Sequence, residues 1–176
     1  TGNAGNFTAD GTPWITPYDL SGREVRKFIT RGAQDVSDEG IKNASLKKIP
    51  AGTVLLSSRA PIGYMAIART ELTTNQGFKS FIPSNEYSTA FIYYTVKGSL
   101  RTITQYASGS TFKEVSAAVL KTVKIALPNT DVVEQFTASV ASIFKRQDLL
   151  ELENQQLAQL RDWLLPMLMN GQVTLT

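Results

Sequence analysis

A heptad pattern of apolar residues near the C-terminus constrains the fold of this chain more than any other feature of its sequence. From Phe136 onward, seam positions recur at alternating steps of four and three residues, which is the spacing of a coiled coil. One class of seam positions is apolar throughout, whereas the other has a polar centre, and polar seam residues fix register and partner. The seam consists of Phe136, Val140, Ile143, Gln147, Leu150, Asn154, Leu157, Arg161, Leu164 and Leu168. The sequence therefore predicts a long helix that pairs with a specific partner helix as a coiled coil or helical hairpin.

Residues at both ends of this helix indicate its bounds. Thr130 or Asp131 is suited to cap its start. Pro166 lies near its end and is expected to kink or terminate it. We therefore expect a spacer or dimerisation helix over residues 129–171, with about 40 residues and a length of about 60 Å at ~1.5 Å per residue. A short tail over residues 172–176 follows it.

The residues before this helix have a different character. Short apolar runs separated by Gly, Pro, Asn and Ser predict short strands and loops, with a few helices between them. This pattern indicates a compact α+β domain over residues 1–128 that is rich in β-structure. The expected strands are residues 53–57, 64–68, 78–82 and 123–127, and the expected helices are a capped turn at 36–40, a helix at 86–97 between Ser84 and Gly98, and a helix at 112–121.

The residue types that are missing exclude several classes of enzyme. The 176 residues include no Cys and no His, which removes disulfides, thiolate nucleophiles, His-based triads and zinc sites built from these ligands. An enzyme that uses carboxylates would need a recognisable acidic pair, and the acidic group Asp35, Asp38 and Glu39 fits the start of a short helix better. We therefore expect no catalytic residue, no metal site and no cofactor in this chain.

Charge is distributed unevenly along the sequence. Residues 1–128 carry 15 Lys and Arg against 9 Asp and Glu, whereas residues 129–176 carry 3 against 6. This basic body with an acidic tail suits a protein whose body binds a polyanion. A surface adapted for solubility would explain the same distribution of charge. No stretch reaches the roughly 20 apolar residues of a membrane span. The absence of Cys favours a reducing cytoplasm.

Five segments together resemble the specificity (S) subunit of type I restriction–modification systems. The first is GTPWITPYDL at residues 11–20, and the second is PAGTVLLSSRAPIG at residues 50–63. The others are TNQGF at 74–78, GSTF at 109–112 and LRDWLLPMLMNG at 160–171. Their shared order and spacing cover nearly the whole chain, which makes the resemblance specific.

The resemblance implies a non-catalytic subunit that recognises a DNA sequence. Subunits of this family carry two target-recognition domains, each followed by a conserved helix, and each domain reads one half of a bipartite site in double-stranded DNA. This chain has one domain and one helix and does not begin with Met. We therefore expect a half-subunit that forms a homodimer through its helix, or the C-terminal half of a longer subunit. The implied partners are methyltransferase and restriction subunits, which hold the S-adenosylmethionine, ATP and Mg²⁺.

The candidate DNA-binding residues are polar and lie on expected loops or charged strips of the basic body. Arg59 has the donors to contact guanine or a phosphate, and an ion pair that holds its loop is the structural alternative. Asn75 and Gln76 carry amides that suit adenine, and a turn bonded to its own backbone is the alternative. The full set is Thr16, Tyr18, Arg26, Lys27, Ser57, Ser58, Arg59, Asn75, Gln76, Lys79, Ser110, Thr111 and Lys113.

Two other hypotheses fit part of the sequence. In the first hypothesis, the chain is the DNA-recognition end of a single-chain restriction–methyltransferase. Such a protein would have a catalytic domain upstream of this sequence. In the second it is a coiled-coil scaffold whose globular head binds protein or glycan. The scaffold hypothesis predicts no salt-dependent DNA binding and leaves the uneven charge unexplained.

Overall fold

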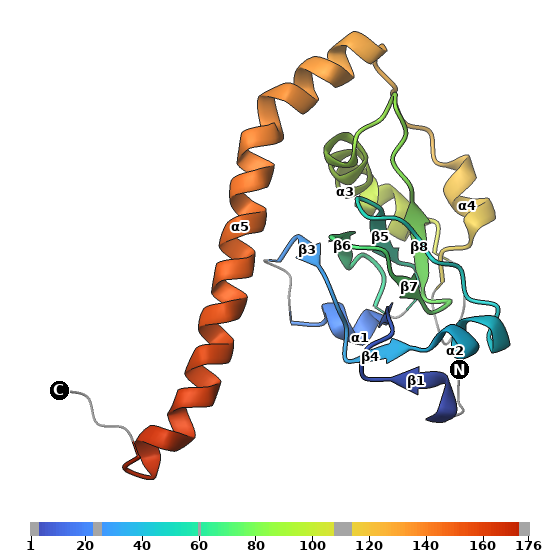
Figure 1. The fold of residues 1–176 in the computed structure, drawn as a ribbon. Helices are drawn as coiled ribbons and strands as arrows, with labels where there is room; N and C mark the ends of the chain where they lie inside the picture. The colour runs from blue at the N-terminus through green and yellow to red at the C-terminus, as the bar shows by residue number, and fades with distance from the viewer. Residues whose placement is uncertain (1–3, 23–25, 60, 108–113, 173–176) are drawn as a thin grey trace. The chain divides into compact units, whose positions relative to one another are not determined.

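The computed structural model describes residues 4–22, 26–59, 61–107 and 114–172. The chain forms two compact units, residues 1–139 and residues 140–176. The first unit contains two four-stranded sheets and several short helices, and the long helix α5 (Thr130–Met169) runs from the first unit into the second (Figure 1). This mixed architecture confirms the expected α+β fold with a long C-terminal helix.

One sheet is built from very short strands that the sequence analysis did not predict. Its strands are β1 (Phe7–Thr8), β2 (Thr12–Ile15), β4 (Gln34–Val36) and β7 (Thr73–Thr74). β4 lies between β1 and β2 and is antiparallel to both, whereas β7 pairs with β2 in parallel. The parallel register places Ile15 beside Thr74, so β2 and β7 end at the same edge of the sheet.

The second sheet contains three strands that were predicted to within one residue at either end. They are β5 (Val54–Ser57), β6 (Met65–Ala68) and β8 (Phe78–Phe81). β5 is central and antiparallel to both neighbours, and the fourth strand, β3 (Phe28–Ile29), pairs with β6 in parallel. The predicted strands at 53–57, 64–68 and 78–82 are therefore confirmed.

β5 is buried on both faces and lies between two apolar clusters. Leu55 belongs to a cluster that includes Ile15 and Leu72 from the region of the first sheet. Leu56 belongs to the other cluster, with Val96 from α3 (Thr89–Gln105). Successive strand residues point to opposite faces of a sheet, so β5 joins the two halves of the core.

The bounds of α3 correct the helix predicted at 86–97. Ser88 is its N-cap, and the Ser88 Oγ accepts a hydrogen bond from the Phe91 N–H at 3.3 Å. The helix then passes through Gly98. A glycine typically ends a helix by adopting a left-handed φ, and Gly98 is not among the glycines with positive φ. Gly98 is a helix-interior residue here, so the predicted end was wrong.

The segment after α3 also differs from the prediction. α4 (Ala117–Thr122) begins after its N-cap Ser116, later than the helix predicted at 112–121, whose first two residues lie outside the described part. Residues 123–127 form no strand in the described structure, and Ile125 there is 46% exposed. No described strand pairs with this segment, and a lone strand gains no ladder hydrogen bonds.

Short helical segments shape the N-terminal half. They are η1 (Ala4–Asn6), α1 (Pro17–Leu20) and α2 (Asp38–Asn43). α2 confirms the capped turn predicted at 36–40. The Ser37 Oγ accepts a hydrogen bond from the Gly40 N–H at 3.0 Å and donates one to the Asn6 carbonyl oxygen at 3.2 Å. Ser37 thus caps α2 and ties it to η1.

Replacing Ser37 with alanine should lower the free energy of unfolding by about 1 kcal/mol, because the capping acceptor is lost from the start of α2. Urea denaturation followed by circular dichroism measures this change. Ser142→Ala is the matched control, since Ser142 is exposed on α5. Equal stabilities of the two variants would show that α2 is capped by another group.

The first turns of α5 belong to the first unit. Asn129 caps the helix in place of the predicted Thr130 or Asp131, because the Asn129 Oδ1 accepts a hydrogen bond from the Val132 N–H at 3.1 Å. Val133, in the next turn, is only 2% exposed. The start of the helix is therefore part of the body's core.

Phe136 continues this packing against α3. Its ring lies edge-on to the rings of Phe91 and Tyr94, with centroids 6.4 Å and 6.1 Å away. At the next residue, the hydroxyls of Thr137 and Ser88 share a hydrogen bond of 2.7 Å. Phe136 was predicted as the first residue of the pairing seam, but its side chain is occupied by α3.

The second unit consists of the rest of α5 among the described residues. Pro166 does not terminate the helix, which continues to Met169, and Gly171 follows it with a left-handed φ of 70°. Along this stretch the seam residues Ile143, Leu150 and Leu157 are exposed, at 62%, 48% and 56%, whereas Val140, Leu164 and Leu168 are partly exposed.

Candidate nucleic-acid interface

The parallel ends of β2 and β7 bring two of the predicted recognition loops together. The Asn75 N–H donates a hydrogen bond to the Ile15 carbonyl oxygen at 3.1 Å, which extends the pairing past the strand ends. The loops also touch, since a Cβ placed on Gly77 would lie 3.1 Å from the Pro17 ring. Beside this contact, Tyr18 is 83% exposed. Tyr18 is therefore available to a partner at this edge of the sheet.

A buried carboxylate holds the loop that carries Tyr18. Asp19 is 6% exposed, and its Oδ2 accepts hydrogen bonds from the Thr16 N–H at 2.8 Å and the Thr16 hydroxyl at 2.7 Å. Its Oδ1 accepts a third bond from the Ala33 N–H at 2.7 Å. The predicted DNA contact of Thr16 is not supported, because its hydroxyl is already bonded within the loop. Asp19 was missed, although the Thr-x-x-Asp spacing of a capping box could have indicated it.

Ser57 and Ser58 support the frame and do not face solvent. Both are fully buried. The Ser57 Oγ donates to the Pro61 carbonyl oxygen at 2.7 Å and accepts from the Tyr64 N–H at 2.8 Å. The Ser58 Oγ and N–H both donate to the Gly77 carbonyl oxygen, at 3.2 Å and 2.7 Å. Because both side chains are buried, the structure does not support the DNA contacts predicted for these two serines.

Asn75 and Gln76 occupy one turn but differ in availability. The Asn75 Oδ1 accepts a hydrogen bond from the Gly77 N–H at 2.9 Å, which is the self-bonded turn considered as the structural alternative. Gln76 is exposed at the tip of the same turn. Of the two amides, Gln76 is the one free to reach a base edge.

Arg59 and Lys79 share one carboxylate. The Arg59 Nε lies 3.4 Å from the Glu114 Oε2, and the Lys79 Nζ lies 3.9 Å from the Glu114 Oε1. The side chains of Arg59, Glu114 and Lys79 are 46%, 41% and 23% exposed. These three residues form the Arg59–Glu114–Lys79 cluster, which places two cations at the surface near the Gln76 turn. Glu114 was not a candidate, because its partners are distant in the sequence.

Lys27 and Arg26 lie next to each other but have different surroundings. Lys27 is 7% exposed, and its Nζ lies 5.2 Å from the ring centroids of both Tyr93 and Tyr94. It also donates a hydrogen bond to the Tyr94 hydroxyl at 3.4 Å. This packing does not support the predicted DNA contact of Lys27. Arg26 is exposed and stays a candidate.

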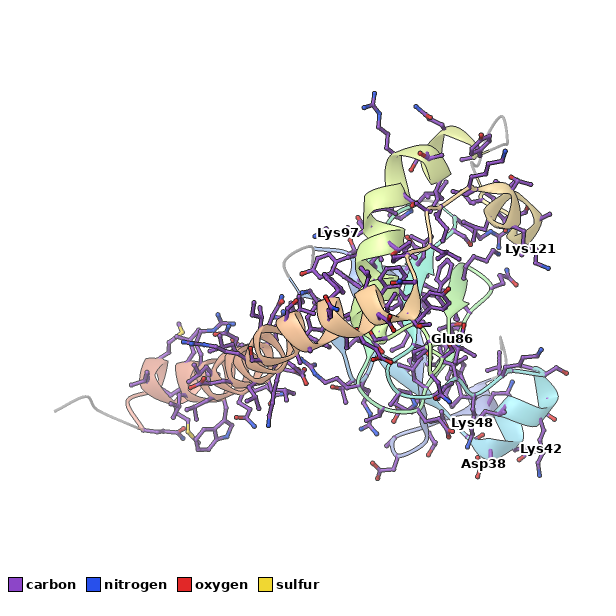
Figure 2. The ribbon with its side chains drawn as sticks, turned by 90° about the horizontal axis from the view of Figure 1, so that it is seen from above. Asp38, Lys42, Lys48, Glu86, Lys97 and Lys121 are labelled. Atoms are coloured by element: carbon purple, nitrogen blue, oxygen red, sulfur yellow. The ribbon has the colours of Figure 1, made fainter. Side chains whose placement is uncertain are left out.

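Other exposed cations are spread over several elements of the body. Lys42 lies on α2, Lys97 on α3 and Lys121 on α4 (Figure 2). Lys48 pairs with Asp38, with its Nζ 3.4 Å from the Asp38 Oδ1. Positive charge alone therefore does not single out one face.

Three candidates, Ser110, Thr111 and Lys113, lie outside the described residues, so the predicted site at a helix start has no structural description. Within the described part of the chain, no group of three or more acidic residues could hold a metal ion. The same residues include no helix long and apolar enough to cross a membrane.

Comparisons with known proteins identify relatives along nearly the whole chain. Residues 2–162 match the family model of the type I restriction modification DNA specificity domain. The MjaIX specificity subunit of a type I restriction enzyme from Methanocaldococcus jannaschii is 42% identical over 148 residues, which are 82% of this chain and 33% of that protein. The HindI specificity subunit from Haemophilus influenzae is 31% identical over 170 residues, 95% of this chain and 36% of that protein. The chain spans about a third of the length of these curated relatives.

Solved structures share the fold. The HsdS subunit from Thermoanaerobacter tengcongensis aligns with a TM-score of 0.59 at 16% identity, covering 98% of this chain and 41% of that one. The S subunit of a type I restriction-modification system from M. genitalium aligns with a TM-score of 0.55 at 15% identity, covering 92% of this chain and 43% of that one. In both cases one copy of the present fold corresponds to less than half of the aligned subunit.

Proposed function

Because the chain belongs to the type I restriction modification DNA specificity family, we propose that it recognises a DNA sequence on behalf of a restriction–modification enzyme. Its role is to bind and not to catalyse, and methyl transfer and cleavage belong to other subunits. The match over residues 2–162 is the observation that carries this proposal.

The DNA-binding face that we propose is the edge where the Tyr18 loop, the Gln76 turn and the Arg59–Glu114–Lys79 cluster lie together. The Gln76 turn is bonded to the strand before the Tyr18 loop through the Asn75 N–H and the Ile15 carbonyl oxygen. It is bonded to the cluster through Ser58, which bonds to both Gly77 and Val115. Tyr18, Gln76 and Arg59 have exposed side chains on this frame. An amide and a guanidinium carry the donors that read base edges in the major groove, and the Lys79 ammonium suits a phosphate.

The arm supplies the second part of the proposed function. One body reads one half of a bipartite site, and the seam of α5 from Val140 to Leu168, which exposes Ile143, Leu150 and Leu157, pairs with a second helix. That helix belongs to a second copy of this chain or to another arm of a longer subunit. The pair of arms holds two bodies apart and provides a docking surface for methyltransferase subunits. The seam begins at Val140 because Phe136 is occupied by α3.

Selection of bound duplexes from a random DNA pool tests DNA recognition, with the full chain alone and with its methyltransferase subunit. We expect one short sequence motif to be enriched. Binding to this motif should weaken as salt rises, because phosphate contacts release counterions. An unenriched pool together with salt-independent binding would favour the scaffold hypothesis.

Substitution of Lys79 tests the proposed face. Lys79→Gln should weaken binding to all duplexes alike and lower the slope of log K against log salt by about 1. Lys42→Gln removes the same charge from α2 and is the matched control (Figure 2). Equal slopes for the two variants would place the DNA on another face of the body.

A further inference from the structure

The backbone at Arg59 and at Glu114 is held by one fully buried neighbour each, Ser58 before Arg59 and Val115 after Glu114. Arg59 and Glu114 form an isolated antiparallel bridge, and the Val115 N–H donates to the Ser58 carbonyl oxygen at 2.9 Å. Ser58 and Val115 are both 0% exposed. The Cα positions of Arg59 and Glu114 are therefore set by the core, and only their side chains remain to be oriented.

Glu114 orients these side chains because each of its two carboxylate oxygens forms an ion pair with a different cation. One oxygen lies 3.4 Å from the Arg59 Nε and the other lies 3.9 Å from the Lys79 Nζ. The guanidinium is planar and carries its five donors in a fixed fork. A carboxylate beside Nε lies at one edge of this fork, whereas the outward N–H groups of the two terminal amino groups lie at its end and can meet another acceptor pair.

We propose that Glu114 is a specificity-determining positioning residue, which holds Arg59 so that its terminal amino groups meet the O6 and N7 of one guanine in the major groove. This inference rests on the proposed function in DNA recognition. An arginine on guanine O6 and N7 is the commonest base-specific contact in protein–DNA complexes.

The charge of Glu114 distinguishes this role from a phosphate clamp. A carboxylate within 4 Å of both cations repels a phosphate and weakens the attraction of the cluster for the DNA backbone. The neutral guanine edge repels this carboxylate less than a phosphate does, because O6 and N7 carry only partial negative charge. The ion pair also restricts the rotamers of Arg59 before binding, so less side-chain entropy is lost when DNA binds. Glu114 thus favours base discrimination over general affinity.

The substitution Glu114→Gln separates general affinity for DNA from discrimination between bases. It removes the negative charge with little change of shape. Affinity for random duplex should stay equal or rise, because one repulsive charge is lost. Discrimination at one guanine of the selected motif should fall about tenfold, which is within the range that a bidentate base contact provides. If the role of Glu114 were purely structural, Glu114→Gln would lower the stability of the protein together with its affinities for random duplex and for the selected motif.

The probe is 7-deazaguanine, which lacks the N7 acceptor, placed at each guanine of the selected duplex in turn. The wild-type full chain should lose about tenfold in affinity at one position, and Glu114→Gln should lose much less at that position. Glu86→Gln, at an exposed carboxylate beyond the opposite end of β8, is the matched control and should behave as wild type (Figure 2). Adding Glu114→Gln to Arg59→Ala should produce no further loss of discrimination.

The outcomes separate this inference from the proposed function. If no motif is enriched, DNA recognition itself fails. If a motif is enriched but Glu114→Gln retains the full sensitivity to 7-deazaguanine, the motif stands and the role of Glu114 is overturned. A loss of affinity for random duplex in Glu114→Gln, with melting temperature unchanged, would also overturn it, because the carboxylate would then support backbone binding.

Discussion

Replacing Asp19 with alanine should lower the free energy of unfolding by about 3 kcal/mol or more. The substitution leaves three donors without their acceptor, namely the N–H and hydroxyl of Thr16 and the N–H of Ala33. An unsatisfied buried donor costs about 1 to 3 kcal/mol, and bonds to a charged acceptor are at the stronger end of the range. Urea denaturation followed by circular dichroism measures the loss.

Two further variants make this prediction specific. Asp10→Ala removes the same charge from an exposed bend and should change stability by less than about 0.5 kcal/mol. Asp19→Asn keeps the shape but turns one acceptor into a donor facing Thr16 or Ala33, so it should destabilise by an intermediate amount. A loss below about 1 kcal/mol for Asp19→Ala would mean that solvent replaces the carboxylate at this site.

The second large effect is expected in the arm. Placing lysine at both Leu150 and Leu157 should abolish self-association of the chain, because both side chains lie in the exposed seam at 48% and 56% exposure. Burying unpaired ammonium groups in a helix interface is strongly unfavourable. Sedimentation of wild type and variant at high micromolar concentration measures the change from dimer to monomer.

Lysine at Gln155 and Gln156 is the control for the added charge. Both glutamines are exposed on α5 and lie outside the seam, so this variant should remain dimeric. Circular dichroism should show equal helix content in all three proteins. A wild-type chain that stays monomeric under these conditions would contradict self-pairing and leave another arm of a longer subunit as the partner.

The parts of the fold that were predicted correctly depend on local sequence patterns. The seam of α5 repeats over many turns, and the central strands β5, β6 and β8 are apolar runs that follow turns. The strands of the first sheet have two to four residues, and their partners are distant in the chain. Their stability comes from non-local pairing, which a local pattern does not contain.

Exposure and hydrogen bonding divide the predicted site residues into two groups. Tyr18, Gln76 and Arg59 have exposed side chains and stay candidates for contact with DNA. Ser57 is polar and follows a strand, but burial and two hydrogen bonds remove it from the surface. Lys27 is basic, but it packs on two tyrosines. Residue type and position in the sequence do not distinguish a polar group that faces solvent from one that satisfies the backbone.

In the Gln76 turn, the residues that determine the shape of the turn are different from the residue exposed at its tip. Its shape depends on buried or bonded groups, such as Ser58 and the side chain of Asn75, whereas Gln76 itself is exposed. A substitution at the tip therefore carries little penalty for folding. Under the proposed function, the recognised DNA sequence can therefore change one exposed residue at a time, without compensating changes in the core.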